Sequence, residues 1–154
     1  MPDRSSSPAA QLLASLSRFP PDVAALAKAC LQRLRRALPG VPQLVYGYAR
    51  SVVVSFSPSE RGAEGAVALA VEARGVRLYV PKDVPDPARR LEGAGSKVRS
   101  VRIEAASELD RGDVHALLRA AIERAAIPPA RGRSSRVVVR SARAVKRPRR
   151  SGGA

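Results

Sequence analysis

The N-terminal part of the chain shows the hydrophobic periodicity of two helices. Ser7-Pro8 is typical of a helix start, because serine can cap the first turn and proline fits its first position. This predicts a short helix that reaches Leu16, before Phe19-Pro20-Pro21 interrupts the pattern. Asp22 is expected to cap a longer helix that ends at Pro39-Gly40. The apolar residues of this longer segment recur on one helix face: Val23, Leu26, Ala27, Cys30, Leu31, Leu34 and Leu38.

The centre of the chain alternates between apolar and polar residues with a period of two. This alternation is typical of strands that bury one face, and the short connections predict an antiparallel meander in chain order. The polar stretch Ser57–Gly65 and the proline-containing stretch Pro81–Arg90 are expected to be loops, the second with a helical turn at Pro87–Leu91. The predicted strands are Leu44–Tyr48, Val52–Phe56, Val67–Val71, Val76–Val80 and Lys97–Ile103.

A last amphipathic helix follows the predicted strands. Asp110 is expected to cap it, Asp113 lies in its first turn, and Pro128-Pro129 stops it. Its apolar face consists of Val114, Leu117, Leu118, Ala121, Ile122 and Ala125.

The order of these elements predicts an α+β fold, in which an antiparallel five-strand meander has helices before and after it. We expect one domain, residues 8–127, after a disordered N-terminus of residues 1–7. Residues 128–154 contain one short apolar run, Val137–Val139. Because so little apolar surface cannot offset the entropy of ordering, this segment is predicted to be a disordered basic tail.

Positive charge is concentrated in the predicted tail. The formal net charge is +15, and nine basic residues lie between positions 131 and 150 without an acidic one. Such a segment can contact the phosphates of DNA, RNA or acidic lipids without reading sequence, and it can equally be a solvated tail with no partner. The candidate nucleic-acid contacts are Arg131, Arg133, Arg136, Arg140, Arg143, Lys146, Arg147, Arg149 and Arg150.

Composition argues against several classes of site. One cysteine, Cys30, and one histidine, His115, leave no disulfide framework, Cys-rich metal site or Ser-His-Asp triad, so we expect no enzyme. Cys30 is expected to be a small core residue, and His115 a solvated helix residue. No apolar run reaches the ~18 residues of a membrane span and no secretory signal is present, so we expect a cytoplasmic protein without a membrane partner.

Short motifs stand in a fixed order around the predicted sheet. Tyr46-Gly47 follows the long helix, and the last strands carry Pro85-Asp86-Pro87, Gly93-Ala94-Gly95, Arg99 and Val101-Arg102-Ile103. Their order resembles that of the YdhG-like domain family, over the chain from Gln11 to Ala126. The resemblance implies a small bacterial α+β domain of largely unknown function, in a family whose members include frataxin-like iron chaperones.

The acidic residues do not indicate a metal site by themselves. Iron would require a cluster of oxygen ligands, and most carboxylates are scattered along the sequence. We therefore predict no metal ligands and no cofactor, and iron is implied by the resemblance alone. The one group of acidic residues surrounds the start of the last helix, where capping explains part of it: Glu104, Glu108, Asp110 and Asp113.

Four side chains are candidates for binding a small ligand or an anion. Lys97 and Arg99 follow Gly93-x-Gly95, which can present backbone N–H groups to an anion or can simply form a tight turn. Arg99 falls on the core-side face of its strand, so it needs a carboxylate, a rim position or a bound anion. Tyr46 and Tyr48 fall on one side of their strand, where they can line a pocket or pack on the sheet.

The leading hypothesis from the sequence is a non-enzymatic binding or accessory domain with an unknown small ligand or anion. The first alternative is a protein that associates with nucleic acid through its arginine-rich tail. The second is an intracellular iron chaperone, which only the family resemblance implies.

Overall fold

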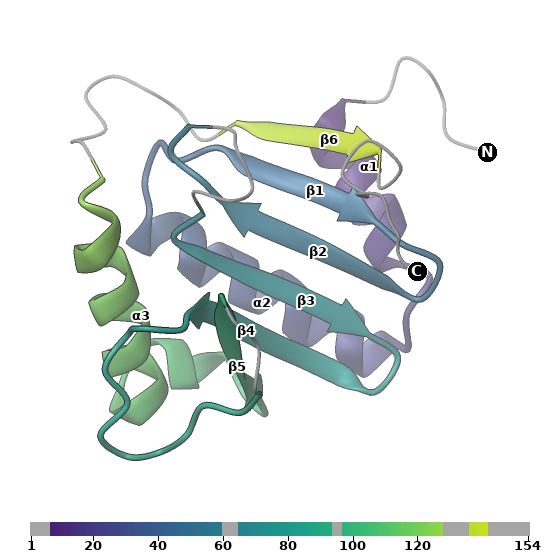
Figure 1. Cartoon of the computed structure of the whole chain (residues 1–154). Helices are drawn as coiled ribbons and strands as arrows, with labels where there is room; N and C mark the ends of the chain where they lie inside the picture. The colour runs from purple at the N-terminus through teal and green to yellow at the C-terminus, as the bar shows by residue number, and fades with distance from the viewer. Residues whose placement is uncertain (1–6, 60–64, 94–96, 128–135, 142–154) are drawn as a thin grey trace, which may run out of the picture.

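The computed structural model describes residues 7–59, 65–93, 97–127 and 136–141 (Figure 1). Helices stand at both ends of a run of strands, and a short 3-10 helix, η2, precedes the last α-helix. In chain order the elements are α1 (Pro8–Leu16), α2 (Pro21–Ala37), β1 (Gln43–Gly47), β2 (Ser51–Phe56), β3 (Val67–Glu72), β4 (Gly75–Pro81), β5 (Val98–Ile103), η2 (Ala106–Leu109), α3 (Gly112–Ala125) and β6 (Val137–Ser141).

The sheet contains the predicted meander and one further strand. Its order is β5-β4-β3-β2-β1-β6, and β1 to β5 are antiparallel neighbours in chain order, as predicted. β6 runs parallel to β1, with Val137 opposite Gln43 and Ser141 opposite Gly47. The three α-helices lie on one side of the sheet (Figure 1). The α+β class and the meander are therefore confirmed, and the complete sheet is mixed rather than purely antiparallel.

The prediction of a fully disordered tail is wrong for Val137–Ser141. Each residue of this segment lies opposite a residue of β1, and the N–H of Gln43 donates to the carbonyl oxygen of Arg136 at 2.7 Å. Val137 also packs against the hydrophobic core. The backbone partners that order this strand come from β1, which is distant in sequence, so local composition does not reveal them. The remaining tail residues and positions 1–6 lie outside the described residues.

The core lies between the sheet and the helices, and alternating strand residues supply one of its walls. In β2 the side chains of Val52, Val54 and Phe56 face the helices and are buried. Leu12 and Leu16 of α1 and the predicted apolar stripes of α2 and α3 complete the core. Since the fully buried aromatic is Phe56, leucine and valine provide most of the packed volume.

Three local predictions need correction. Pro21 takes the first helical position of α2, so Pro20 rather than Asp22 stands at the cap. α3 begins at Gly112, whose φ of +85° suits glycine, and Asp110 therefore ends η2 instead of capping α3. The expected helical turn at Pro87–Leu91 is absent from the described loop. There the carboxylate of Asp86 accepts hydrogen bonds from two backbone N–H groups, those of Arg90 and Leu91.

The pairing of β6 with β1 predicts that the C-terminal segment stabilises the domain. Deleting residues 128–154 uncovers the edge of β1 and removes the packing of Val137. A loss of about 2–3 kcal/mol would lower the melting temperature by roughly 10 °C in a domain of this size. Deleting only residues 142–154 retains β6 and serves as the control, for which we expect little change. Equal melting temperatures for the two truncations, measured by circular dichroism, would contradict the role of β6.

The buried stripe of α3 predicts a large effect of a cavity at Leu117. Leu117 is 3% exposed within the core, so Leu117→Ala should reduce the free energy of unfolding by ~2–5 kcal/mol. Leu13→Ala is the matched control, because Leu13 lies on α1 with 52% of its surface exposed. Denaturant unfolding measures both variants, and similar values for the two would show that α3 packs differently.

Candidate functional site

The two tyrosines and Arg99 do not converge on one pocket. β1 and β5 lie four strand spacings apart in the sheet, which is about 19 Å. Tyr46 points to the face without helices, since its register partner Val53 alternates with core residues, whereas Arg99 shares the helix-side face with Val101. Tyr48 follows the end of β1, and its N–H donates to the carbonyl oxygen of Ser51. The structure thus separates the predicted ligand set into two places.

Arg99 takes the rim position that the sequence analysis allowed for it. One Nη donates to the carbonyl oxygen of Lys82 at 3.2 Å, while the Nε is buried and has no partner among the described residues. Lys97 is exposed beside it, and its carbonyl oxygen accepts from the N–H of Lys82. Residues 94–96 of the predicted glycine turn lie outside the described residues, so anion binding by Lys97 and Arg99 stays a prediction.

The carboxylates around α3 are engaged by arginines. Among the described residues, no three His, Cys, Asp or Glu side chains gather as a metal site. The ion pair with Arg124 holds the pKa of Asp83 below its usual range, because its hydrogen bond favours the charged carboxylate. The ion pairs on this side of the molecule are Arg33–Asp110 (2.9 Å), Arg77–Glu92 (3.0 Å), Arg90–Asp113 (3.4 Å), Arg102–Glu104 (3.2 Å) and Arg124–Asp83 (2.6 Å).

His115 and Cys30 both have structural surroundings. His115 is half-buried rather than solvated, and its Nδ1 donates to the carbonyl oxygen of Leu109 at 2.9 Å, which links α3 to η2. Cys30 is fully buried, as predicted, and burial raises the pKa of its thiol from 9.0 to about 12. The protonated, buried thiol of Cys30 is therefore not a ready nucleophile, and the hydrogen bond of His115 joins two helices.

The opposite side of the molecule has a different charge pattern. We call it the cationic edge and define it as residues 8–19, 43–56 and 136–141, which comprise α1, the β1–β2 hairpin and β6. These three stretches contain no Asp or Glu. In Figure 1 they lie together, with α1 behind the end of β6 and beside the hairpin. The basic residues of the cationic edge are Arg18, Arg50, Arg136 and Arg140.

The turn of the β1–β2 hairpin is held in place from α1. The N–H of Tyr48 donates to the carbonyl oxygen of Ser51 at 2.8 Å, which closes the turn. One Nη of Arg18 donates to the carbonyl oxygens of Tyr48 and Ser51, at 2.8 Å and 3.1 Å. The same guanidinium lies 5.1 Å from the ring centroid of Phe19, at the distance of a cation–π contact. Because Ser141 pairs with Gly47, β6 ends beside this turn.

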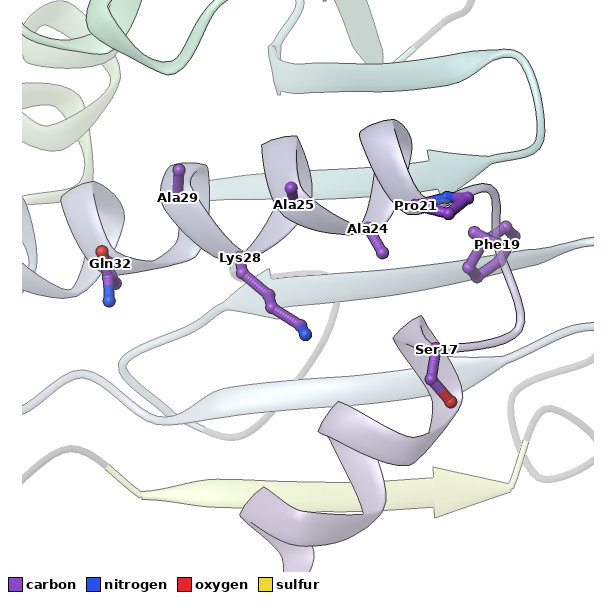
Figure 2. Close-up of a pocket in the computed structure, with 8 residues that line it drawn as sticks. All are labelled: Ser17, Phe19, Pro21, Ala24, Ala25, Lys28, Ala29 and Gln32. Atoms are coloured by element: carbon purple, nitrogen blue, oxygen red, sulfur yellow. The ribbon is translucent and has the colours of Figure 1, made fainter.

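A groove of about 540 Å³ lies where α1 meets α2 (Figure 2). Figure 2 shows Lys28 extending from α2 on the side of α1, with Phe19 in the connection between the helices. The hydroxyl of Ser17 donates to the carbonyl oxygen of Ala14, so its proton is engaged by the backbone. It is lined by Ser17, Phe19, Pro21, Ala24, Ala25, Lys28, Ala29 and Gln32.

The sequence analysis did not identify Arg18 and Arg50 as functional candidates. The lack of acidic residues in each of the three stretches can be read from the sequence. The proximity of the three stretches cannot be read from the sequence, because it depends on the pairing of β6 with β1 and on the hydrogen bonds of Arg18 to the hairpin.

No protein-family model, curated protein or solved structure is significantly similar to this chain. Among the described helices, none combines the length and the apolar character needed to cross a membrane.

The raised pKa of Cys30 predicts slow reaction with thiol reagents in the folded protein. At about pH 8 the native thiol is almost entirely protonated, whereas an exposed thiol with a pKa near 9.0 is partly thiolate. Titration with a chromogenic disulfide should therefore show one reactive thiol only after unfolding in denaturant. Rapid labelling of the native protein would contradict the burial of Cys30. Because the pKa of Cys30 is higher in the folded than in the unfolded protein, pH above about 9 should favour unfolding, since only the unfolded thiol ionises readily.

Proposed function

We propose that this protein is a non-enzymatic nucleic-acid-binding protein that contacts phosphates with its cationic edge and with the basic residues on both sides of β6. The observation that carries this proposal is the pairing of β6 with β1. It attaches the arginine-rich part of the chain to an edge whose sequence contains no acidic residue. The proposal narrows the leading sequence hypothesis of a non-enzymatic binding domain to one class of ligand.

The position of β6 decides which charges lie near the basic segment. β6 ends at Ser141, opposite Gly47 and beside the hairpin turn that carries Arg50. In the sequence, five basic residues follow β6 and three precede it, at positions 131, 133 and 136. A segment that instead projected freely from the end of α3 would start next to Glu123 and Asp83. The three stretches of the cationic edge contain no Asp or Glu, but Glu72 of β3 lies opposite Ser51, the residue after Arg50. Exposed guanidinium groups can form the bidentate hydrogen bonds that phosphates accept.

Binding by these groups is expected to depend little on base sequence. Contacts with phosphates fix the position of a protein on nucleic acid but carry no sequence information. The free energy comes largely from the release of counterions, which makes the affinity fall steeply with salt.

The other readings of the sequence receive less support from the described residues. An iron chaperone would need free carboxylates, and four of those around α3, namely Asp83, Glu104, Asp110 and Asp113, form ion pairs with arginines. Membership of the YdhG-like family stays a proposal, supported by the order of two helices, five antiparallel strands and a helix that carry its motifs.

Salt titration of duplex DNA binding tests the proposed function. If about five cationic side chains contact phosphates, the slope of log affinity against log salt should be roughly −4 to −5, from ~0.9 for each neutralised phosphate. Replacing Arg143, Lys146, Arg147, Arg149 and Arg150 by glutamine should remove most of this slope, and Arg50→Gln should reduce it by about 0.9. Fluorescence anisotropy with a labelled duplex measures the affinities.

Arg119→Gln is the matched control, because Arg119 is an exposed arginine on α3, away from the cationic edge. It should leave both the affinity and the slope unchanged. No binding at low salt would overturn the proposed function, and a larger effect of Arg119→Gln than of Arg50→Gln would move the interface to α3.

A further inference from the structure

Tyr48 presents an exposed aromatic ring within the cationic edge. It is 40% exposed, whereas Tyr46 is 7% exposed and Tyr79 is half-buried. Its sequence neighbours, Gly47 and Ala49, are too small to cover a ring. The ring is therefore partly open to solvent, two residues from Arg50 in the same turn.

The backbone that carries this ring is held by hydrogen bonds on both sides of the turn. The N–H of Tyr48 bonds to Ser51, and the carbonyl oxygens of both residues accept from Arg18 of the connection after α1. A tyrosine has only two side-chain torsions, so a ring on a fixed turn loses little entropy when it is covered. The geometry is that of a preorganised aromatic surface beside a cation.

We propose that Tyr48 stacks on an unpaired base, so that the cationic edge prefers single-stranded nucleic acid to a duplex. This inference rests on the proposed function and adds the class of nucleic acid to it. Every base has a π-face, which a single strand exposes and a duplex covers with neighbouring base pairs. Arg50, two residues away in the same turn, supplies the phosphate contact that accompanies a stacked base.

The predicted tail alone would give no such preference. Residues 128–154 contain no aromatic residue, so their contacts are with phosphates, which both forms of nucleic acid present. β1 ends beside the end of β6, so Tyr48 follows the residue that lies opposite Ser141. Tyr48 thus supplies the stacking group that the basic segment lacks.

The test compares a short oligothymidylate with a duplex of the same length, using the full chain at constant low salt. We expect tighter binding of the single strand. Tyr48→Ala should weaken oligothymidylate binding roughly 5- to 100-fold, the range for one lost base–aromatic stack, and should leave duplex binding nearly unchanged. Tyr48→Phe keeps the ring and should restore the preference. Val98→Ala is the control for an exposed apolar side chain outside the cationic edge, and it should change neither affinity.

A spectroscopic measurement distinguishes stacking from a structural role of the residue. The chain contains no tryptophan, so Tyr48→Trp introduces a single reporter. Its fluorescence should be quenched by oligothymidylate at stoichiometric ratios and much less by the duplex. Quenching by both to the same extent would overturn the stacking proposal.

The outcomes separate this inference from the proposed function. If both nucleic acids bind equally well and Tyr48→Ala changes neither affinity, stacking is overturned while phosphate binding by the cationic edge stands. If neither binds at low salt, the proposed function fails, and the role of Tyr48 fails with it.

Discussion

The parallel pairing between β6 and β1 is the contact on which the organisation of this protein depends. A parallel partner for β1 requires a long connection, and here the connection contains all of the chain from β2 to α3. The C-terminal strand therefore returns to the side of the sheet where the N-terminal helix and the first hairpin lie. Without this pairing, Arg136 and Arg140 would have no fixed relation to Arg18, Arg50 or Tyr48.

The same residue type has two roles on the two sides of the molecule. On the side of β4, β5 and α3, arginines form ion pairs with nearby carboxylates, which link α2, the loop after β4 and α3. Surface pairs of this kind contribute little stability each, but they neutralise the charge of both partners. The three stretches of the cationic edge contain no acidic residue, and the neighbouring strand β3 contributes Glu72 opposite Ser51, so positive charge is in excess around Arg50. The distribution of carboxylates, more than the number of arginines, distinguishes the two sides.

Arg18 shows how one cation can have a structural role on an edge proposed to bind phosphate. Its guanidinium donates to two carbonyl oxygens of the hairpin turn and lies against Phe19. These contacts connect the end of α1 to the turn that carries Tyr48. The order of this turn fixes an aromatic ring and a positive charge at a set separation, which is what recognition of a base and its phosphate requires.

The sequence by itself determined the elements whose residues are buried on one side. Local periodicity is enough to predict the buried stripe of α2 around Cys30 and the alternation of Val52, Val54 and Phe56, because burial of one face selects apolar residues at a fixed spacing. The sequence also determined the face on which Arg99 lies.

Only the tertiary structure decided the partner of each polar group. Arg99 bonds to the carbonyl oxygen of Lys82, and Asp110, the expected helix cap, pairs with Arg33. Arg18 bonds to the hairpin turn. Likewise, three valines become part of β6 only because β1 offers an open edge. The spacing of apolar residues in the sequence predicts which residues are buried, whereas hydrogen-bond partners depend on segments that are distant in sequence and meet only after folding.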